Sequence, residues 1–261
     1  MTKPKDPIGA DATVCSVAEP LSFGSLFAGI GGIDLGFERA GMVCKWQVEI
    51  DEYARRILEK HWPNVRRWDD VCTWPQPDTE RVDVICGGFP CQDISSNNQY
   101  KQGITGNKSG LFHQVVRIVR DLRPRVVMLE NVSDLLVRGM GTVLGELASI
   151  GFDAWWDCVP SAMFGLPQRR WRTYIVAYAN GERFEASDKW ISSRSQRIEW
   201  GKHDRLDEAE RRAKDGPSFL SRVDDGIPRR VDRIRCLGNA VCPQAAEWIG
   251  RRIVAVSKDV A

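Results

Sequence analysis

The sequence contains few of the residues that build metal sites. It has only three histidines in 261 residues, and its eight cysteines are scattered without a Cys-x-x-Cys pair. Zinc sites need several such ligands at close spacing, so no metal centre is expected. In an intracellular chain of this size we expect free thiols, most of them packed in the interior.

Long apolar runs and a strong charge imbalance are also missing. No run approaches the length of a membrane span and the N-terminus has no signal-peptide core, so a cytoplasmic protein with no membrane partner is expected. The net charge of +2 neither requires nor excludes nucleic acid. A chain of this length suits one main domain with a smaller appendage.

The first part of the chain has the pattern of a nucleoside-binding unit. A strand is predicted at 22–28, and its end opens the glycine-rich stretch Phe27-Ala-Gly-Ile-Gly-Gly32. A helix at 33–40 and a strand at 42–50 follow, with Glu49 at the end of the strand. Glycines permit close backbone approach, and a terminal acid accepts hydrogen bonds from ribose hydroxyls. The glycine spacing departs from the dinucleotide pattern, but a nucleoside cofactor is still expected.

A cysteine follows the next predicted strand. The apolar run at 82–86 leads into Gly87-Gly-Phe-Pro-Cys91, where two glycines are expected to open a tight turn and Pro90 to stiffen the backbone. Open α/β sheets bind their ligands at such strand exits. Cys91 is either a small buried residue or a nucleophile, and the polar residues after it favour the nucleophile. The polar loop at 97–108 is a candidate lid.

Two further strands place charged side chains near this cysteine. The strand at 126–129 ends in Glu130-Asn131, and parallel strands end on one edge, so Glu130 is expected beside Cys91. Capping of the next helix is the alternative interpretation. Arg170 and Arg172 begin another strand and share one face, where they suit a phosphate or carbonyl oxygen, or surface ion pairs.

Weaker signals complete the order of elements. Helices are predicted at 51–60 with Asp51 as N-cap, at 109–121, at 134–149 and at 244–256, and strands near 64–68 and at 152–159. Asp69-Asp70 either receives an adenine amino group or forms a simple turn. After residue 178 arginines are interleaved with acids, which indicates a second module.

Together these motifs resemble the DNA (cytosine-5) methyltransferases of bacteria and phages. The resemblance runs from about residue 23 to residue 252. Its motifs occur in the family's order, as Phe27-Ala-Gly-Ile-Gly-Gly, Glu49, Pro90-Cys91-Gln92, Glu130-Asn131-Val132, Gln168-x-Arg170-x-Arg172 and Gly238-Asn239-Ala240-Val241. It implies an α/β fold, a Rossmann-like S-adenosylmethionine-dependent methyltransferase sheet with a small target recognition module.

The resemblance also implies covalent catalysis on cytosine. Cys91 would add to carbon 6, and Glu130 would stabilise the charge that develops on ring nitrogen 3. Arg172, supported by Arg170, would meet the carbonyl oxygen of the base, while Asn131 would orient the loop. The base would be flipped out of double-stranded DNA, the implied partner, and no obligate protein partner is inferred.

The implied cofactor is S-adenosyl-L-methionine, which leaves as S-adenosyl-L-homocysteine. Phe27 would stack on the adenine, Glu49 would hold the ribose, and Asp70 would receive the adenine amino group, although the family usually has a glycine where Asp69 stands. The complete set of implied cofactor contacts is Phe27, Gly29, Gly31, Gly32, Glu49, Ile50, Asp70, Val71, Pro90 and Asn239.

The implied domains are a leader at 1–20, a catalytic and cofactor-binding domain at 21–178, a recognition module at 179–225 and a C-terminal segment at 226–261 that packs back on the catalytic domain. The module is much shorter than the family's usual recognition domain, so recognition would be short or relaxed. The tail from Asp225 to Asn239 resembles that of phage and prophage members, which favours a solitary enzyme over one paired with a restriction enzyme.

Three alternatives stay open at this point. A tRNA cytosine-5 methyltransferase would use the same chemistry with an equally small second module. A non-catalytic DNA-binding regulator could keep the fold, but Cys91, Glu130 and the two arginines argue against it. A dinucleotide oxidoreductase is disfavoured by the glycine spacing.

Overall fold

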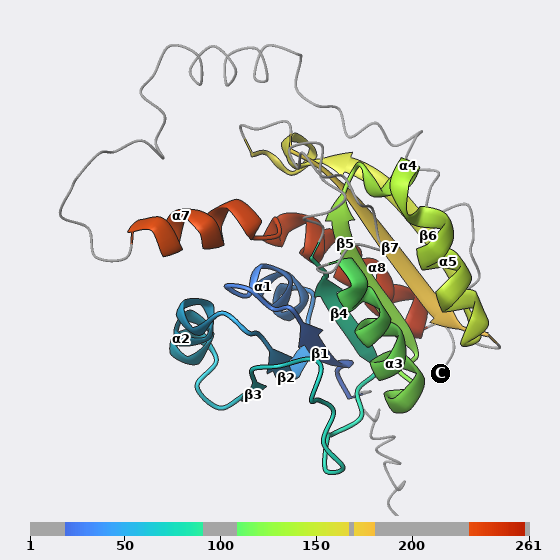
Figure 1. Ribbon diagram of the computed structural model, residues 1–261, viewed down its shortest axis with the longest axis horizontal. Coiled ribbons are helices and arrows are strands. Elements are labelled where there is room, and N and C mark those ends of the chain that lie inside the picture. Colours follow the sequence, from blue (N-terminus) through green and yellow to red (C-terminus); the bar gives the residue numbers. More distant parts are fainter. Residues whose placement is uncertain (1–18, 91–108, 167–169, 181–229, 259–261) are drawn as a thin grey trace, which may run out of the picture.

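The computed structural model describes residues 19–90, 109–166, 170–180 and 230–258, and these fold around one seven-stranded sheet (Figure 1). Its strand order is β3-β2-β1-β4-β5-β7-β6. The strands are β1 Ser22–Leu26, β2 Val43–Val48, β3 Arg66–Trp68, β4 Val84–Gly88, β5 Val126–Val132, β6 Phe152–Pro160 and β7 Trp171–Ala179. Strands β1 to β5 are parallel, whereas β7 runs antiparallel to β5 and β6. The Rossmann-like α/β sheet predicted from the sequence is confirmed.

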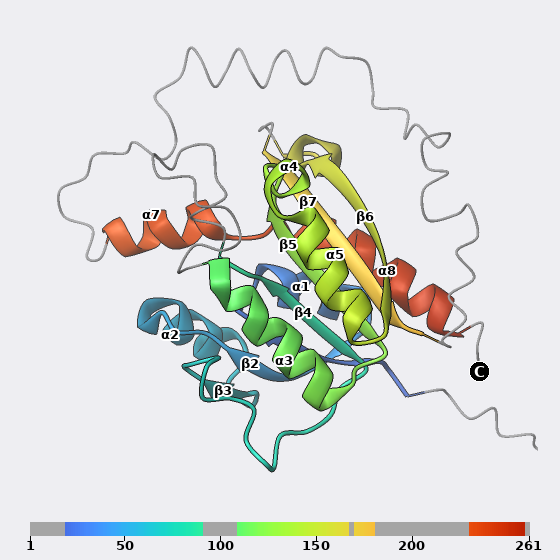
Figure 2. The same ribbon diagram turned by 45° about the vertical axis from the view of Figure 1, so that its right-hand side comes forward.

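Helices cover both faces of this sheet (Figures 1 and 2). The helices α1 (Gly32–Arg39) and α8 (Pro243–Lys258) pack together on one face, and α3 (Phe112–Leu122) and α5 (Met140–Ser149) cover the other. The other described helices are α2 (Glu52–His61), α4 (Leu135–Arg138), α7 (Arg230–Asn239) and the short 3-10 helices η2 (Ser109–Leu111) and η3 (Ser161–Phe164).

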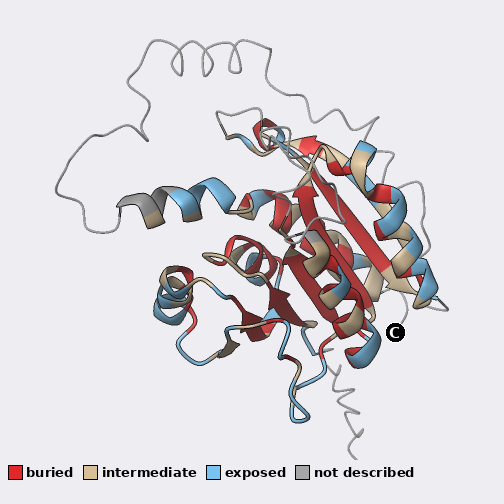
Figure 3. Cartoon of the chain, viewed as in Figure 1, coloured by how far each residue is buried: buried red, intermediate tan, exposed pale blue. Residues whose placement is uncertain are grey.

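The hydrophobic core lies on both sides of the central strands, which are buried along most of their length (Figure 3). In β5, Val127 and Leu129 join the cluster under α3 and α5, while Val126 and Met128 join the cluster under α1 and α8. This alternation follows from the two-residue period of a strand. Parallel strands covered on both faces are apolar on both, which is why they read as continuous apolar runs in the sequence.

The glycine pair before Cys91 does not open a turn, as the sequence suggested, but ends strand β4. Gly87 pairs with Leu26 and with Leu129, and Gly88 pairs with Glu130. A Cβ at Gly87 would lie 2.5 Å from the carbonyl oxygen of Leu26, which is closer than atoms pack. The glycines are therefore explained by close neighbours on adjacent strands and not by turn geometry.

One helical prediction needs correction, and one helix was missed. The single helix expected at 134–149 is divided into α4 and α5, because Gly139 between them has an extended φ of −166°. The helix α7 was not expected at all, although it leads directly to Ala240 and Val241. The N-cap prediction is confirmed, since the Asp51 side chain accepts a hydrogen bond from the Ala54 amide at 3.0 Å.

Several predictions fall outside the described residues. They are those for Cys91, for the candidate lid at 97–108, for nearly all of the leader at 1–20 and for nearly all of the module at 179–225. Among the helices that are described, none is long and apolar enough to cross a membrane. The described residues also contain no group of three or more His, Cys, Asp or Glu that could hold a metal ion.

Candidate functional site at the carboxyl edge of the sheet

The parallel strands β1 to β5 end at one edge of the sheet (Figure 1), and several of the described residues predicted for the site follow or lie near these strand ends. The glycine turn follows β1, Glu49 follows β2, and Phe89-Pro90 follows β4. Glu130 and Asn131 lie near the end of β5. Because β7 is antiparallel, its first residues reach the same edge, which brings Arg172 there. The sheet topology alone therefore unites motifs that are distant in sequence.

The glycine turn between β1 and α1 has an unusual backbone. Phe27, Gly29 and Gly31 have φ values of 52°, 57° and 84°, so three of five consecutive residues are left-handed. Such a conformation is unfavourable for Phe27, and it persists only where the surrounding structure enforces it. No described atom lies within 4 Å of the position that a Cβ would take at Gly29, so the backbone there faces open space.

Gly31 and Gly32 have a different reason to be glycine. A Cβ at Gly31 would meet the ring of Trp62 at 2.4 Å, and one at Gly32 would meet the carbonyl oxygen of Val241 at 2.4 Å. These two predicted cofactor residues are therefore also sites where the turn packs closely on α2 and on the segment before α8. The second distance places the Val241 backbone next to the turn.

Glu49 turns its carboxylate toward the glycine turn. Its Oε2 accepts a hydrogen bond from the Gly29 amide at 2.7 Å, and its Oε1 accepts one from the Asp51 amide at 2.7 Å. Burial raises the pKa of Glu49, and the two amides partly oppose this. A carboxylate has about four lone-pair sites, so Glu49 can still accept hydrogen bonds from a bound diol. The adjacent Ile50 side chain is 72% exposed and offers an apolar surface beside it.

The two residues predicted after β3 differ in their surroundings. The carboxylate of Asp70 accepts a hydrogen bond from the Cys72 amide at 2.8 Å, which is the geometry of an Asx turn. This contact agrees with the simple-turn interpretation and leaves lone pairs on the carboxylate. Val71 is buried, with 6% of its surface exposed, and belongs to the core cluster under α3.

Glu130 forms an ion pair at the end of β5. The Nε of Arg172 lies 2.9 Å from its Oε1, and the Glu130 side chain is 9% exposed. Burial raises the pKa of Glu130, and the positive charges of Arg172 and Arg170 partly oppose this. Within the described residues Oε1 has no hydrogen bond of normal geometry. Glu130 is thus a carboxyl group that takes up a proton more readily than usual and retains acceptor capacity.

Arg170 is placed differently from Arg172. Its Nη1 donates a hydrogen bond to the Ala240 carbonyl oxygen at 2.8 Å, which connects the start of β7 with the segment after α7. Ser161 contacts the Arg170 carbonyl through both its amide, at 2.9 Å, and its hydroxyl, at 3.2 Å. Arg170 therefore joins the start of β7 to the segments at Ser161 and Ala240, and its positive charge also acts on Glu130.

Asn131 is 2% exposed and links β5 to the segment that leads to Cys91. Its Nδ2 donates a hydrogen bond to the Phe89 carbonyl oxygen at 3.2 Å, and its Oδ1 accepts one from the Val132 amide at 2.8 Å. Phe89 is followed by the half-buried Pro90, the last described residue before Cys91. Asn131 therefore fixes the point from which the cysteine loop departs.

Sequence reasoning missed one buried residue of this edge, Asp34. It lies in the first turn of α1 with 0% of its surface exposed and contacts side chains of both β1 and β2. The available signal was an acid within the otherwise apolar stretch Ile33-Asp-Leu-Gly-Phe37, on a helix expected to pack on the sheet.

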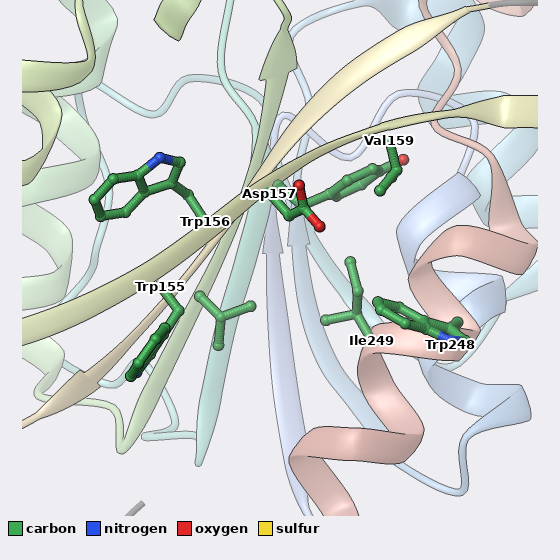
Figure 4. Close-up of a pocket in the computed structure, with 8 residues that line it drawn as sticks. Trp155, Trp156, Asp157, Val159, Trp248 and Ile249 are labelled. Atoms are coloured by element: carbon green, nitrogen blue, oxygen red, sulfur yellow. The ribbon is translucent and has the colours of Figure 1, made fainter. Parts of the chain in front are cut away.

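A separate apolar pocket lies between α8 and the β6–β7 part of the sheet (Figure 4). Tryptophans from both sides line it, with Trp155 and Trp156 on β6 and Trp248 on α8. The guanidinium of Arg252 stacks on Trp248, 3.5 Å from the ring centroid. None of the predicted cofactor residues lines this pocket.

Comparison with known proteins matches the chain to one family. The family model described as C-5 cytosine-specific DNA methylase matches residues 21–216. The type II methyltransferase M.BsuFI of Bacillus subtilis is 35% identical over 162 residues, which cover 60% of this chain and 39% of that protein. The chain spans only 39% to 54% of the length of three such type II methyltransferases.

Two solved structures share the fold. The Entamoeba histolytica methyltransferase EhMeth superposes with a TM-score of 0.59 at 14% identity, covering 93% of this chain and 99% of that one. A structure described as a DNA modification methyltransferase encoded within an E. coli prophage has a TM-score of 0.55 at 24% identity, covering 65% of this chain and 49% of that one. At these identities the likeness concerns the fold alone.

Proposed function

Because the chain belongs to the C-5 cytosine-specific DNA methylase family, we propose that it transfers a methyl group from S-adenosylmethionine to carbon 5 of cytosine in duplex DNA. The observation that carries this proposal is the Glu130–Arg172 pair, which lies on the same sheet edge as the glycine turn and its hydrogen bond from Gly29 to Glu49. One motif suits a cytosine ring and the other suits a nucleoside cofactor.

The cofactor fits the turn on physical grounds. The backbone at Gly29 faces open space, Glu49 retains lone pairs for ribose hydroxyls, and the exposed Ile50 can cover one face of an adenine. Phe27, Asp70, Pro90 and Asn239 complete the proposed contacts. When bound, S-adenosylmethionine supplies an electrophilic methyl group on a sulfonium centre.

Cys91 is the proposed nucleophile. Carbon 5 of cytosine reacts poorly with an electrophile, and addition of a thiolate to carbon 6 makes the ring electron-rich at carbon 5. The new bond joins the cysteine sulfur to carbon 6, and the electron pair of the former double bond becomes available at carbon 5. The link from Asn131 to Phe89 supports this assignment, because it anchors the chain just before Cys91 beside Glu130.

Glu130 is the proposed acid. Addition at carbon 6 places negative charge on ring nitrogen 3, and a protonated carboxyl group hydrogen-bonded there stabilises it. The raised pKa of Glu130 favours that protonated form. Arg172 holds the carboxyl group and contacts the carbonyl oxygen of the base, and Arg170 supports this role through its positive charge. Once carbon 5 carries the methyl group, a base or water removes the carbon 5 proton. That electron pair restores the double bond between carbons 5 and 6, the bond from carbon 6 to the cysteine sulfur breaks, and the Cys91 thiolate is restored.

This chemistry requires the base to leave the duplex. A stacked cytosine exposes neither face to a thiol, so the target is flipped into the site at a cost of about a few kcal/mol. The residues at 97–108 and 179–225 are the proposed contacts to DNA, and both ranges are outside the described residues except for 179 and 180. The target sequence depends on which side chains reach the base edges.

Methyl-group transfer from labelled S-adenosylmethionine tests the proposal. The purified chain is incubated with duplex DNA or with tRNA, and Cys91→Ser is the matched variant. We expect label on DNA with the wild type and none with Cys91→Ser. Label on tRNA alone would overturn the DNA assignment, and unchanged transfer by Cys91→Ser would overturn the covalent mechanism. Bisulfite sequencing of plasmid from expressing cells then gives the target site.

A further inference from the structure

A buried hydrogen-bond network lies directly beneath the glycine turn. The carboxylate of Asp34 accepts a hydrogen bond from the Ser25 hydroxyl at 3.1 Å and one from the Gln47 side-chain amide at 2.8 Å. The Cys44 thiol lies 3.8 Å from the same carboxylate. Asp34, Ser25 and Gln47 are each 0% exposed, so solvent does not reach the network.

The three partners belong to the three elements that carry the proposed cofactor contacts. Ser25 is on β1, two residues before Phe27, and Gln47 is on β2, two residues before Glu49. Asp34 is in the first turn of α1, three residues after Gly31. One carboxylate thus connects both strand ends and the start of the helix that follows the turn.

Burial of this carboxylate costs free energy of folding. A buried carboxylate without a cation loses its hydration, and no ion pair between described residues involves Asp34. The Gln47 side chain depends on it as well, because its Oε1 has no partner among the described residues and its amide donates only to Asp34. An apolar side chain would fill the same place on α1 at lower cost.

The turn above the network needs such support. Phe27 has a positive φ, which its side chain disfavours, and no described atom packs against the position that a Cβ would take at Gly29. The carboxylate of Glu49 contacts this turn only through the Gly29 amide, so the position of β2 relative to β1 decides whether that bond forms. A shift of either strand end or of α1 would move the backbone that faces the cofactor.

We propose that Asp34 is a positioning residue for S-adenosylmethionine, which it serves by holding β1, β2 and α1 in the arrangement that the glycine turn requires. Asp34 does not touch the cofactor in this role and acts through Ser25 and Gln47. The inference rests on the proposed function, because it assumes that the glycine turn and Glu49 bind this cofactor.

The test separates cofactor binding from catalysis and from folding. The dissociation constant of S-adenosylhomocysteine, and KM for S-adenosylmethionine and kcat with duplex DNA, are measured on the full chain with Asp34→Ala, Asp34→Asn and Ser25→Ala. A charged hydrogen bond corresponds to a factor of about 10 to 100, so Asp34→Ala is expected to raise Kd and KM by that factor. Ser25→Ala is expected to raise both about threefold to tenfold, with kcat at saturating cofactor within about threefold of wild type in every variant.

A control variant removes a comparable bond at the opposite edge. The carboxylate of Asp83 accepts hydrogen bonds from the Ser22 amide at 2.8 Å and the Ser22 hydroxyl at 2.7 Å, at the start of β1. Asp83→Asn is expected to lower the melting temperature while leaving Kd and KM unchanged. If Asp34→Ala does not fold, Ser25→Ala decides.

Two outcomes overturn the inference. Wild-type Kd in folded Asp34→Ala and in Ser25→Ala would show that the network does not position the turn, as would an equal rise of Kd in Asp83→Asn. A different result would overturn the proposed function: a wild type that binds S-adenosylhomocysteine but does not methylate DNA. In that case the comparison of Kd between the variants and the wild type still tests the role of Asp34.

Discussion

The Nε of Arg172 lies 2.9 Å from Oε1 of Glu130, across the antiparallel pairing of β5 with β7. Glu130 is paired with Tyr174 and Arg172 with Val132, so the two side chains are diagonal neighbours on one face of the sheet. The reversed direction of β7 is what allows an arginine at the beginning of one strand to meet an acid at the end of another. Loss of either partner should therefore have a distinct effect.

Replacing Glu130 by Gln should slow methyl transfer without preventing cofactor binding. The amide has nearly the shape of the acid but cannot supply a proton to ring nitrogen 3, and acid catalysis contributes about 10² to 10⁴ in rate. Single-turnover transfer to duplex DNA is expected to fall by a factor in that range, with Kd for S-adenosylhomocysteine unchanged. Glu146→Gln on α5 is the control, and a wild-type rate in Glu130→Gln would refute the assigned role.

Replacing Arg172 by Ala should change the pH dependence of the reaction. Burial raises the pKa of Glu130 and Arg172 opposes that rise, so removal of the guanidinium should raise the pKa further. If the protonated acid is the active form, its activity is lost as pH rises through this pKa. The limb of the pH–rate profile that belongs to Glu130 should therefore move to higher pH in Arg172→Ala, while the rate at the optimum falls. An unmoved limb would contradict the coupling.

The Asp34 network should also be visible in the pH dependence of stability. Burial raises the pKa of Asp34 from 3.8 to about 6, so the folded state holds this proton more tightly than the unfolded state. The resulting stabilisation is complete below pH 3.8 and is lost as pH rises through about 6. Between pH 4.5 and 7.5 this corresponds to about 2 kcal/mol.

Urea unfolding of the wild type and of Asp34→Asn at several pH values measures this effect. The free energy of unfolding of the wild type, taken relative to that of Asp34→Asn, should decrease by about 2 kcal/mol from pH 4.5 to 7.5. Glu49 and Glu130 titrate in both proteins, so their contributions cancel in the difference. A constant difference across this range would mean that Asp34 keeps an ordinary pKa.

Much of the fold could be predicted because its signals are local. Apolar runs marked β4 and β5, the strands on either side of the glycine turn and its helix marked β1 and β2, and a single aspartate correctly marked the start of α2. The division between α4 and α5 was missed because it depends on the backbone conformation of one glycine. The helix α7 was missed because its sequence is polar and its helical pattern is weak.

The wrong interpretation of Gly87-Gly88 has a different cause. Glycine pairs commonly open turns, but here each glycine responds to a neighbour on another strand, which a local pattern does not contain. Asp34 was missed for the same reason, because its partners Ser25 and Gln47 come from separate strands. The positions of Glu49, Glu130 and Arg172 at one sheet edge could be expected from the predicted strand ends, whereas packing between separate strands could not.

Replacing Gly88 by Ala tests the effect of packing next to Glu130. A Cβ at this position would lie 3.0 Å from Oε2 of Glu130 and 3.8 Å from Cγ2 of Val241. The first distance is shorter than ordinary contact, so in the Gly88→Ala variant the Glu130 carboxylate must shift by a few tenths of an ångström. The ion pair with Arg172 opposes this shift. Misplacement by about 1 Å can cost about 10²-fold in rate, so a loss of roughly tenfold in kcat is expected.

The same substitution in α5 provides the comparison. Gly145 has no described atom within 4 Å of its Cβ position, so Gly145→Ala should stabilise the helix by about 0.5–1 kcal/mol and leave kcat unchanged. Gly88→Ala should lose activity while its urea midpoint stays near that of the wild type, because the clash is with a side-chain end and not with backbone. Equal kcat in the two variants would mean that the carboxyl group of Glu130 does not need its present position.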